Sequence, residues 1–390
     1  MAHRRHGKGL GMVDSQKTIT EIRLWRVLWK ALFLFAAFNV LWYVAQPLSL
    51  LNRLSVYGTL FPPRERFPFA EFPAESYALT VDNLDQLFAA HRIAQPKAAD
   101  EFRIALLGDS AVWGYLLRAD QTQAACINAL DLRTSDGRRV RAYNLGYPTL
   151  TVIKDLLILR RALDHAPDLI VWSTSLASLY PSDQLDFPLI LAHREEVSAL
   201  QAEYAFKLDQ YPLPPRHWSE RTFFGQRRAI ADWLRHQLYA PAWASTRLDH
   251  VLARFVAPHP VNLLPDDNVL SVNVLRLRQA GSLAPEDLNF DVLKAGIALA
   301  ARRGVPSVLV NEPIYRNETH PLRYNTYYPR WAYDGYRAAF AAVAAQEGWR
   351  YFDLWDAAPP DQFTDTDFHL TAAANCAYAE RLIRAALGSP

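Results

Sequence analysis

The chain has little of what marks metal-binding, nucleic-acid-binding or disordered proteins. Its 390 residues include only two cysteines, Cys126 and Cys376, which are too far apart for a C-x-x-C metal motif. The formal net charge is only +2, and there is no basic run with interleaved aromatic residues, so we expect no nucleic-acid partner. Charged residues make up 21% and hydrophobic residues 51% of the chain, which is the composition of a globular protein.

The two cysteines each lie in a segment with the pattern of an amphipathic helix. We expect two buried thiols, because free cysteine is among the most buried residue types. One disulfide bond is the alternative if the chain lies in an oxidising compartment.

A run without charged residues lies near the amino terminus, at residues 31–52. A helix over this run would be about 33 Å long, which matches the hydrocarbon core of a bilayer. The preceding residues 1–30 carry seven Lys and Arg residues against two acidic ones, and such an excess favours the cytoplasm. We therefore predict a basic cytoplasmic tail and a single transmembrane helix in the cell membrane, with the rest of the chain extracytoplasmic. A cleaved signal peptide and a buried helix of a soluble domain are the alternatives.

After a proline-rich connector at residues 53–100, short apolar runs alternate with helical segments. The expected strands lie at residues 102–107, 140–145, 168–172, 306–311 and 349–354, and the expected helices at 120–130, 151–163, 286–303, 333–346 and 371–387. Short buried strands separated by helices are typical of a parallel sheet that is covered on both faces. Residues 101–390 are thus predicted to form an α/β three-layer sandwich with a five-stranded, mostly parallel sheet.

Residues 180–285 interrupt this alternation. They are rich in Pro, Trp and Arg and include an amphipathic stretch at 222–238. We interpret them as a helical insertion that lies over the edge of the sheet.

The first expected strand is followed directly by Gly108-Asp109-Ser110, with Gly114 four residues after the serine. A serine at a strand-to-helix turn is exposed at the mouth of the sheet, and amides at the start of the helix can stabilise an oxyanion. Alone, the motif is equally typical of a helix N-cap. Near the other end of the chain, His369 precedes the last expected helix, with Asp365 and Asp367 four and two residues before it. A nucleophilic serine needs such a base, and the base needs an acceptor that fixes its tautomer.

The two motifs together resemble those of the SGNH/GDSL hydrolase and acyltransferase superfamily, in order and in place relative to the strands. The resemblance implies the flavodoxin-like SGNH fold, with Ser110 as nucleophile and His369 as base. The usual acid of the family lies three residues before the histidine, where this chain has Thr366. We prefer Asp367 as the acid, because its spacing is similar to that of the alginate O-acetylation proteins, and we keep Asp365 as the other candidate.

The resemblance also implies two oxyanion donors beside the serine. Gly146 matches the glycine that donates its backbone N–H, and a turn glycine is the plain alternative. The family's asparagine after the third strand is absent, and Ser173, Thr174 or Ser175 would have to donate a hydroxyl instead. Loss of one such donor costs on the order of 3 kcal/mol of transition-state stabilisation.

The activity that the resemblance implies is acyl transfer through an acyl-enzyme at Ser110, without a metal or organic cofactor. Water would resolve the intermediate in an esterase, and a sugar hydroxyl would do so in an O-acyltransferase. A single-span anchor with an outward domain is similar to the alginate O-acetylation and D-alanyl transfer proteins. This layout implies an acylated cell-envelope polysaccharide as substrate and a membrane partner that donates the acyl group. The alternative is a catalytically degenerate SGNH domain that serves as a non-enzymatic subunit of a membrane or envelope complex.

Overall fold

The computed structural model describes residues 23–70, 79–181, 184–208, 212–246 and 283–388. Most of the predicted basic tail and the end of the insertion therefore lie outside the described residues. The centre of the structure is one five-stranded parallel sheet in the order β2-β1-β3-β4-β5. The strands are β1 (Glu101–Leu107), β2 (Arg139–Asn144), β3 (Leu169–Thr174), β4 (Ser307–Asn311) and β5 (Arg350–Asp353). The predicted flavodoxin-like α/β fold is confirmed.

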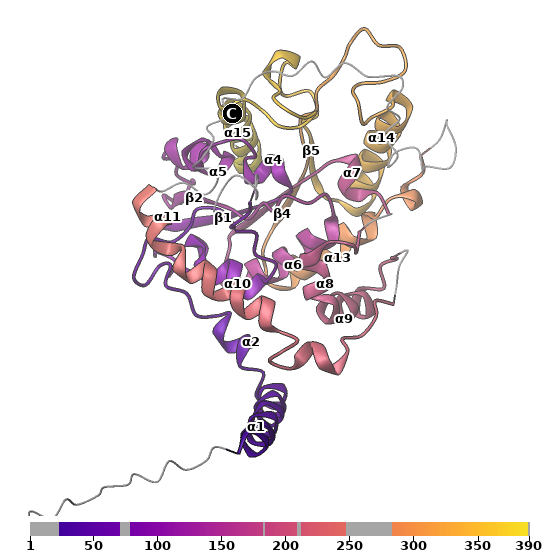
Figure 1. Cartoon of the computed structure of the whole chain (residues 1–390). Coiled ribbons are helices and arrows are strands. Elements are labelled where there is room, and N and C mark those ends of the chain that lie inside the picture. Colours follow the sequence, from indigo (N-terminus) through magenta and orange to yellow (C-terminus); the bar gives the residue numbers. More distant parts are fainter. Residues whose placement is uncertain (1–22, 71–78, 182–183, 209–211, 247–282, 389–390) are drawn as a thin grey trace, which may run out of the picture.

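Helices cover both faces of the sheet (Figure 1). One layer comprises α6 (Val152–Ala162), α13 (Phe290–Arg302) and α14 (Arg330–Glu347), and the other comprises α5 (Gln123–Ala129) and α15 (Ala372–Leu387). Each apolar strand alternates between the two layers, as the period of two in a strand requires. In β1, for example, Ala105 and Leu107 face the first layer, whereas Ile104 and Leu106 face the second.

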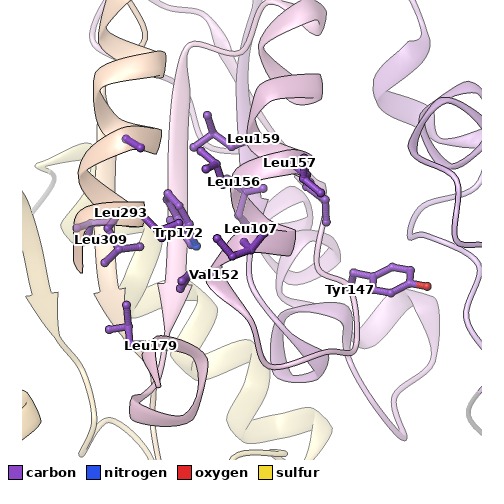
Figure 2. Packing of buried hydrophobic residues seen from close by; sticks show 14 of the residues in the cluster. Leu107, Tyr147, Val152, Leu156, Leu157, Leu159, Trp172, Leu179, Leu293 and Leu309 are labelled. Carbon is purple, nitrogen blue, oxygen red and sulfur yellow. The ribbon is translucent and has the colours of Figure 1, made fainter. Parts of the chain in front are cut away.

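Trp172 of β3 is the centre of the first layer (Figure 2). Its fully buried ring lies among leucines of α6 and α13, and its indole N–H donates to Asp155 Oδ2 at 3.2 Å. A β-carbon at Gly296 of α13 would collide with this ring. The bulk of the tryptophan is therefore matched by the absence of a side chain on the facing helix.

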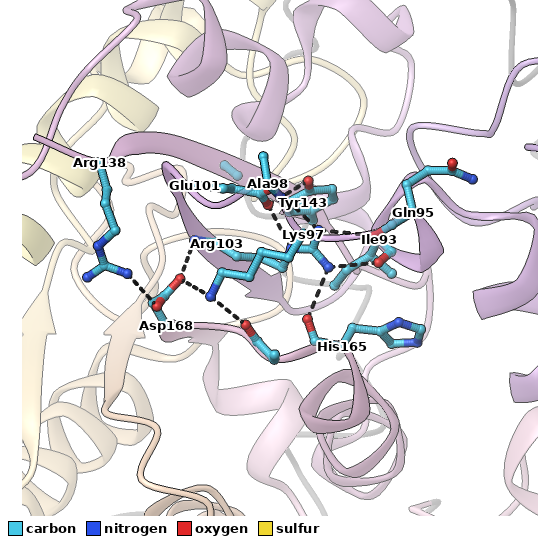
Figure 3. Close-up of polar contacts among 12 residues, drawn as sticks. Ile93, Gln95, Lys97, Ala98, Glu101, Arg103, Arg138, Tyr143, His165 and Asp168 are labelled. Atoms are coloured by element: carbon cyan, nitrogen blue, oxygen red, sulfur yellow. Dashed lines mark hydrogen bonds and ion pairs between the residues drawn. The ribbon is translucent and has the colours of Figure 1, made fainter.

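A polar network closes the amino end of the sheet (Figure 3). The buried Arg103 of β1 pairs with Glu101 at 2.7 Å and also donates to the carbonyls of Ile93 and His165. Asp168, just before β3, accepts from the Arg103 amide and from side chains of the connector and of the residue before β2. This end is occupied by structural contacts, so the opposite, carboxyl end is left for a functional site.

The helix α1 spans Leu24–Ala45, so the predicted bounds of 31–52 are wrong at both ends. Gln46 takes a left-handed conformation (φ 43°), and Pro47 begins the separate helix α2 (Pro47–Leu51), because proline cannot continue the ladder of α1. No residue of α1 is buried, and the helix is long and apolar enough to cross a membrane. Figure 1 shows it projecting away from the rest of the structure, which is not the place of a core helix.

The connector is held against the sheet domain through much of its length. Phe67 lies in the main core, and the helix α3 (Leu84–Ala90) packs against the same core through Leu84, Leu87 and Phe88. The fully buried Arg66 donates to the carbonyls of Trp113, Gly114 and Leu117. The connector is thus part of the packed domain.

The described part of the insertion is helical, as predicted. It contains α8 (Pro188–Ala192), α9 (Arg194–Tyr204), α10 (Arg227–Leu238) and α11 (Ala240–Thr246). Glu196 of α9 pairs with Arg160 and Arg161 of α6, so α9 packs on a helix of the first layer. This part of the insertion therefore lies outside a helical layer, because the exposed side of α6 carries the charges that α9 complements. The expected place of the rest over the edge of the sheet stays a prediction.

Cys126 of α5 and Cys376 of α15 form a disulfide bond, with their Cα atoms 5.2 Å apart and 250 residues between them. The expectation of two buried thiols is wrong, and the alternative holds. The two helices pack side by side on one face of the sheet, which brings together cysteines that the sequence separates.

Replacing both cysteines by serine should lower the free energy of unfolding by about 2–4 kcal/mol, because the cross-link restricts the unfolded chain. Urea unfolding of the two proteins measures the difference. Ala373→Ser, at an exposed position of the same helix, is the control and should change little. Equal stability of the cysteine variant and the wild type would contradict a structural disulfide.

Candidate active site

Ser110 lies at the sharp turn between β1 and the short helix α4 (Ser110–Trp113). Gly108 has φ 155°, and a β-carbon there would come within 2.5 Å of Val112 Cγ2. The Asp109 side chain caps α4 by accepting from the Ala111 amide at 2.8 Å. The Gly-Asp-Ser sequence thus supplies the tight turn and the cap that hold the serine at the carboxyl end of the sheet.

His369 lies on the segment that returns from β5 to α15. Its backbone carbonyl accepts from the Thr364 amide at 2.8 Å, and Thr371 caps α15 by accepting from the Ala374 amide. The imidazole is only 5% exposed, and the Tyr115 ring stacks on it with centroids 4.8 Å apart. These contacts leave the ring few orientations.

The structure brings the predicted nucleophile and base together. His369 Nε2 lies 2.7 Å from Ser110 Oγ, although 259 residues separate the two in the sequence. The other ring nitrogen, Nδ1, lies 2.9 Å from Asp365 Oδ1. A hydroxyl, an imidazole and a carboxylate are therefore connected in the order that activates a serine.

The preferred acid, Asp367, is wrong as the partner of the histidine, and the second candidate, Asp365, occupies that place. Burial acts to raise the pKa of Asp365, but the hydrogen bond to His369 and its charge outweigh this, so the pKa lies below its usual value. Asp365 therefore stays ionised beside the imidazole, as an orienting carboxylate must.

Asp367 is turned into the protein. Its backbone carbonyl accepts from the Tyr315 amide at 2.6 Å, and its carboxyl group has only the Tyr327 amide, at 3.4 Å, as a partner among the described residues. Burial raises the pKa of Asp367 to about 7. The side chain is therefore a poor charge stabiliser for His369.

Of the expected oxyanion donors, Gly146 packs directly against the turn and helix that carry Ser110. A β-carbon at Gly146 would come within 2.5 Å of the Trp113 amide nitrogen, so only glycine fits against α4. Its N–H, however, donates to Asn144 Oδ1 at 3.1 Å, while the Asn144 amide donates to the Trp113 carbonyl. Gly146 is thus placed beside the site, with its N–H engaged by a neighbouring side chain.

Ser173, Thr174 and Ser175 lie at the carboxyl end of β3 and are buried. Ser175 Oγ lies 3.4 Å from Ser178 Oγ, and Thr174 Oγ1 has no hydrogen-bond partner within the described ranges. In those ranges none of the three hydroxyls is bonded to Ser110 or His369. Their expected role as oxyanion donors stays a prediction.

Glu312 follows β4, was not predicted as a site residue, and is only 2% exposed. Its side chain meets that of Asp109, and neither Glu312 oxygen has an N–H or O–H partner in the described part of the chain. Burial first, and then the charge of Asp109, raise the pKa of Glu312 well above its usual value. Two carboxyl groups in contact in a dry environment hold a proton between them. In the sequence, only the position of Glu312 directly after an interior strand, β4, could have indicated that its side chain lies near Asp109.

A buried cation lies close to these carboxyl groups. Lys154 donates to the carbonyls of Gly108, at 2.7 Å, and Tyr147, at 3.1 Å, and it pairs with Asp155 at 2.6 Å. Both members of the pair are almost fully buried. Lys154 therefore ties the turn before Ser110 to the turn after Gly146.

We expect Asp365→Asn to lower the rate of reaction at Ser110 on the order of 10³-fold, because the imidazole loses its orienting acceptor. The matched variant Asp367→Asn should leave that rate within a few-fold of wild type. The two rates of labelling by a fluorophosphonate test the assignment. Loss of reactivity in Asp367→Asn alone would restore the original choice of acid.

The same Asp367→Asn variant should also be more stable than wild type at pH 8, by about 1–3 kcal/mol. The folded-state pKa of Asp367 is raised from 3.8 to about 7, so this carboxyl contributes stability at low pH that is lost as the pH rises through 7. Thermal unfolding at pH 5 and pH 8 measures the effect.

Glu312→Gln should likewise reduce the loss of stability between acidic and mildly alkaline pH. A raised pKa means that the folded protein keeps a proton that the unfolded chain releases above its ordinary pKa of 4.5. The glutamine amide can donate to Asp109 Oδ2 without titrating. Urea unfolding as a function of pH tests this, and a variant curve as steep as that of wild type would contradict it.

No known family model and no curated protein matches the chain. Three solved structures to which it is similar are a member of the lipolytic protein G-D-S-L family from Veillonella parvula, the carbohydrate acetylesterase Est24 from Sinorhizobium meliloti, and TesA. The first is 10% identical with a TM-score of 0.35, covering 72% of this chain and 97% of its own. Est24 is 10% identical with a TM-score of 0.34, covering 72% of this chain and 98% of its own. TesA is 13% identical with a TM-score of 0.37, covering 73% of this chain and 99% of its own.

Proposed function

We propose that the chain is a serine-dependent enzyme that cleaves ester-linked acyl groups through an acyl-enzyme at Ser110. The observation that carries this proposal is the continuous connection from Ser110 Oγ through His369 to Asp365, at 2.7 Å and 2.9 Å. The non-enzymatic alternative needs neither contact. Both contacts are present although Ser110 and His369 lie 259 positions apart in the sequence, which supports the enzyme.

In the first half-reaction, Ser110 Oγ attacks the ester carbonyl while His369 Nε2 accepts the hydroxyl proton. Asp365 holds the imidazole by Nδ1 and stabilises the imidazolium that forms. As the tetrahedral intermediate collapses, the bond to the leaving alcohol breaks and His369 returns the proton to that alcohol. The amide of Ser110 begins α4 and so has no partner within the helix, which leaves it able to donate to the developing oxyanion.

In the second half-reaction, a hydroxyl compound attacks the acyl-enzyme and His369 again accepts its proton. The ester bond to Ser110 Oγ then breaks, the acyl group leaves on the attacking oxygen, and His369 returns the proton to Ser110 Oγ. Water as the attacking group makes the protein an esterase, and a sugar hydroxyl makes it an O-acyltransferase. We favour an acceptor or substrate in the cell envelope, such as an acylated polysaccharide, because a single span followed by a large domain would hold the site beside that layer. A transferase would require a membrane partner that delivers the acyl group.

We infer that α1 anchors the protein in the cell membrane with the sheet domain outside the cytoplasm. Three observations support this. No residue of α1 is buried, basic residues are in excess before it, and the disulfide of Cys126 and Cys376 favours an oxidising compartment.

Labelling with a fluorophosphonate probe tests the activated serine in the full chain. Wild type should be labelled, whereas Ser110→Ala and His369→Ala should lose at least about 10²-fold in labelling rate, since each removes a member of the unit. Ser307→Ala, at the start of β4 and at the other end of the sheet, is the control and should label normally. A folded wild-type protein that is not labelled would favour the non-enzymatic alternative.

Turnover of small p-nitrophenyl esters then separates the two enzymatic forms. Steady hydrolysis indicates an esterase. A single burst of p-nitrophenol that stops at the acyl-enzyme indicates a transferase that awaits its acceptor.

A further inference from the structure

A loop of the insertion, residues 221–226, lies against the side of α1. The Phe224 amide donates to Asn39 Oδ1 at 3.0 Å, and the Trp42 indole N–H donates to Gln226 Oε1 at 2.7 Å. Asn39 and Trp42 are among the few polar groups of an otherwise apolar helix. The loop thus satisfies polar groups of α1 that lipid would leave unpaired.

Aromatic rings extend the same contact. Phe223 packs between Phe38 and Trp42, with centroids 4.9 Å and 5.1 Å away, and Phe224 meets Phe35 at 6.4 Å. Phe224 is still 57% exposed after these contacts. The tip of the loop is therefore apolar on the side that faces away from α1.

The position of these contacts along α1 determines whether they lie in the hydrocarbon core of the membrane or in water. The helix has 22 residues and is about 33 Å long, so its whole length is needed to cross a hydrocarbon core of about 30 Å. Asn39 and Phe35 lie six and ten residues before the end at Ala45, which corresponds to about 9 Å and 15 Å. If the membrane ended at Asn39, the remaining helix would be about 24 Å long, which is too short to cross it.

The following helix, α10, is held at both ends by hydrogen bonds that fix its position relative to α1. Its amino end is joined to α1 through Gln226, and its carboxyl end to the connector, because Gln237 accepts from the Val56 amide and the His236 carbonyl accepts from Tyr57. Figure 1 shows α10 lying across the domain on the side from which α1 and α2 extend.

One side of α10 is apolar and exposed, at Leu234 (49%) and Leu238 (73%). Arg227 and Arg228 are exposed at its first turn, and neither forms an ion pair within the described ranges. Exposed leucines beside unpaired arginines are typical of a helix that lies in the interface of an anionic membrane.

We propose that residues 222–226 insert into the outer leaflet beside α1 and that α10 lies in the headgroup region, where Arg227 and Arg228 meet anionic phospholipid. This inference rests on the membrane anchoring by α1 proposed above. It makes the insertion a second membrane contact that sets the orientation of the domain. The helix α15, which His369 precedes, lies at the end of the domain remote from α1, so the catalytic site is turned away from the bilayer (Figure 1).

Spin labels on the full chain in vesicles test the proposal. The two native cysteines are paired, so a single introduced cysteine carries the nitroxide. The test positions are Phe224→Cys and Leu238→Cys. Phe33→Cys, on the exposed side of α1, reports the anchor itself, and Leu322→Cys, between β4 and α14, is the control in water. Collision rates with oxygen, which concentrates in lipid, and with a nickel chelate, which stays in water, are compared in vesicles of phosphatidylethanolamine and phosphatidylglycerol.

We expect the ratio of oxygen to nickel collisions to be several-fold higher at Phe224→Cys than at Leu322→Cys, with Leu238→Cys in between. In vesicles of phosphatidylcholine alone, the ratio at Leu238→Cys should fall, since the arginines lose their anionic partners.

A water-like ratio at Phe224→Cys with a lipid-like ratio at Phe33→Cys would overturn the inserted loop and leave the anchor intact. A water-like ratio at both would overturn the anchor as well, whereas labelling of Ser110 by the fluorophosphonate is independent of either result. Low collision with both reagents at Phe224→Cys would mean a protein partner and would also contradict the proposal.

Discussion

The hydrogen bond between Ser110 and His369 is the constraint on which the rest of the structure depends. It joins residues 259 positions apart, and a parallel sheet makes this meeting feasible because all strands end at the same edge. Ser110 follows the interior strand β1, whereas His369 follows β5 at the edge of the sheet. The segment before α15 must therefore return across the ends of β4 and β3. Backbone contacts of Asp367 with Tyr315 and of His369 with Thr364 hold it on that path.

The second constraint is the charge buried behind the nucleophile. Lys154 is a fully buried cation that holds the carbonyls of Gly108 and Tyr147, and Asp155 neutralises it. A buried pair of this kind gains little net stability, because desolvation offsets the attraction, but it is costly to break. The pair instead holds two turns in place, the one at Gly108 before Ser110 and the one at Tyr147 after Gly146. Glu312 differs, because its partner Asp109 is also an acid and only a retained proton makes the contact favourable.

The elements of the sheet could be predicted from the sequence because they are short apolar runs whose ends coincide with Gly, Pro or capping residues. Val152–Ala162, for instance, begins at the Thr151 cap where the apolar helix was expected. The choice between Asp365 and Asp367 could not be predicted from the sequence, since an acid four or two residues before the histidine suits the role equally well. It depends on which carboxyl the returning loop turns outward, and the amides of Tyr315 and Tyr327, distant in sequence, decide that. Glu312 was missed, and the disulfide was expected only as the alternative, for the same reason, because each depends on a partner that only the packed layers bring close.

The connector links the membrane side of the protein to the catalytic turn. Arg66 donates to three carbonyls at the end of α4, and its guanidinium lies 4.0 Å from the Trp113 ring centroid. These carbonyls follow Ser110 by only a few residues, so the geometry of the turn at Ser110 depends on a side chain from the stretch that follows α1 and α2. The same stretch meets α10 at Tyr57 and His236. Anchor, insertion and nucleophile are thus connected by short-range contacts, and the connector is better understood as a brace than as a flexible tether. A brace of this kind gives the active site a defined height and direction relative to the membrane, which a tether would leave to diffusion.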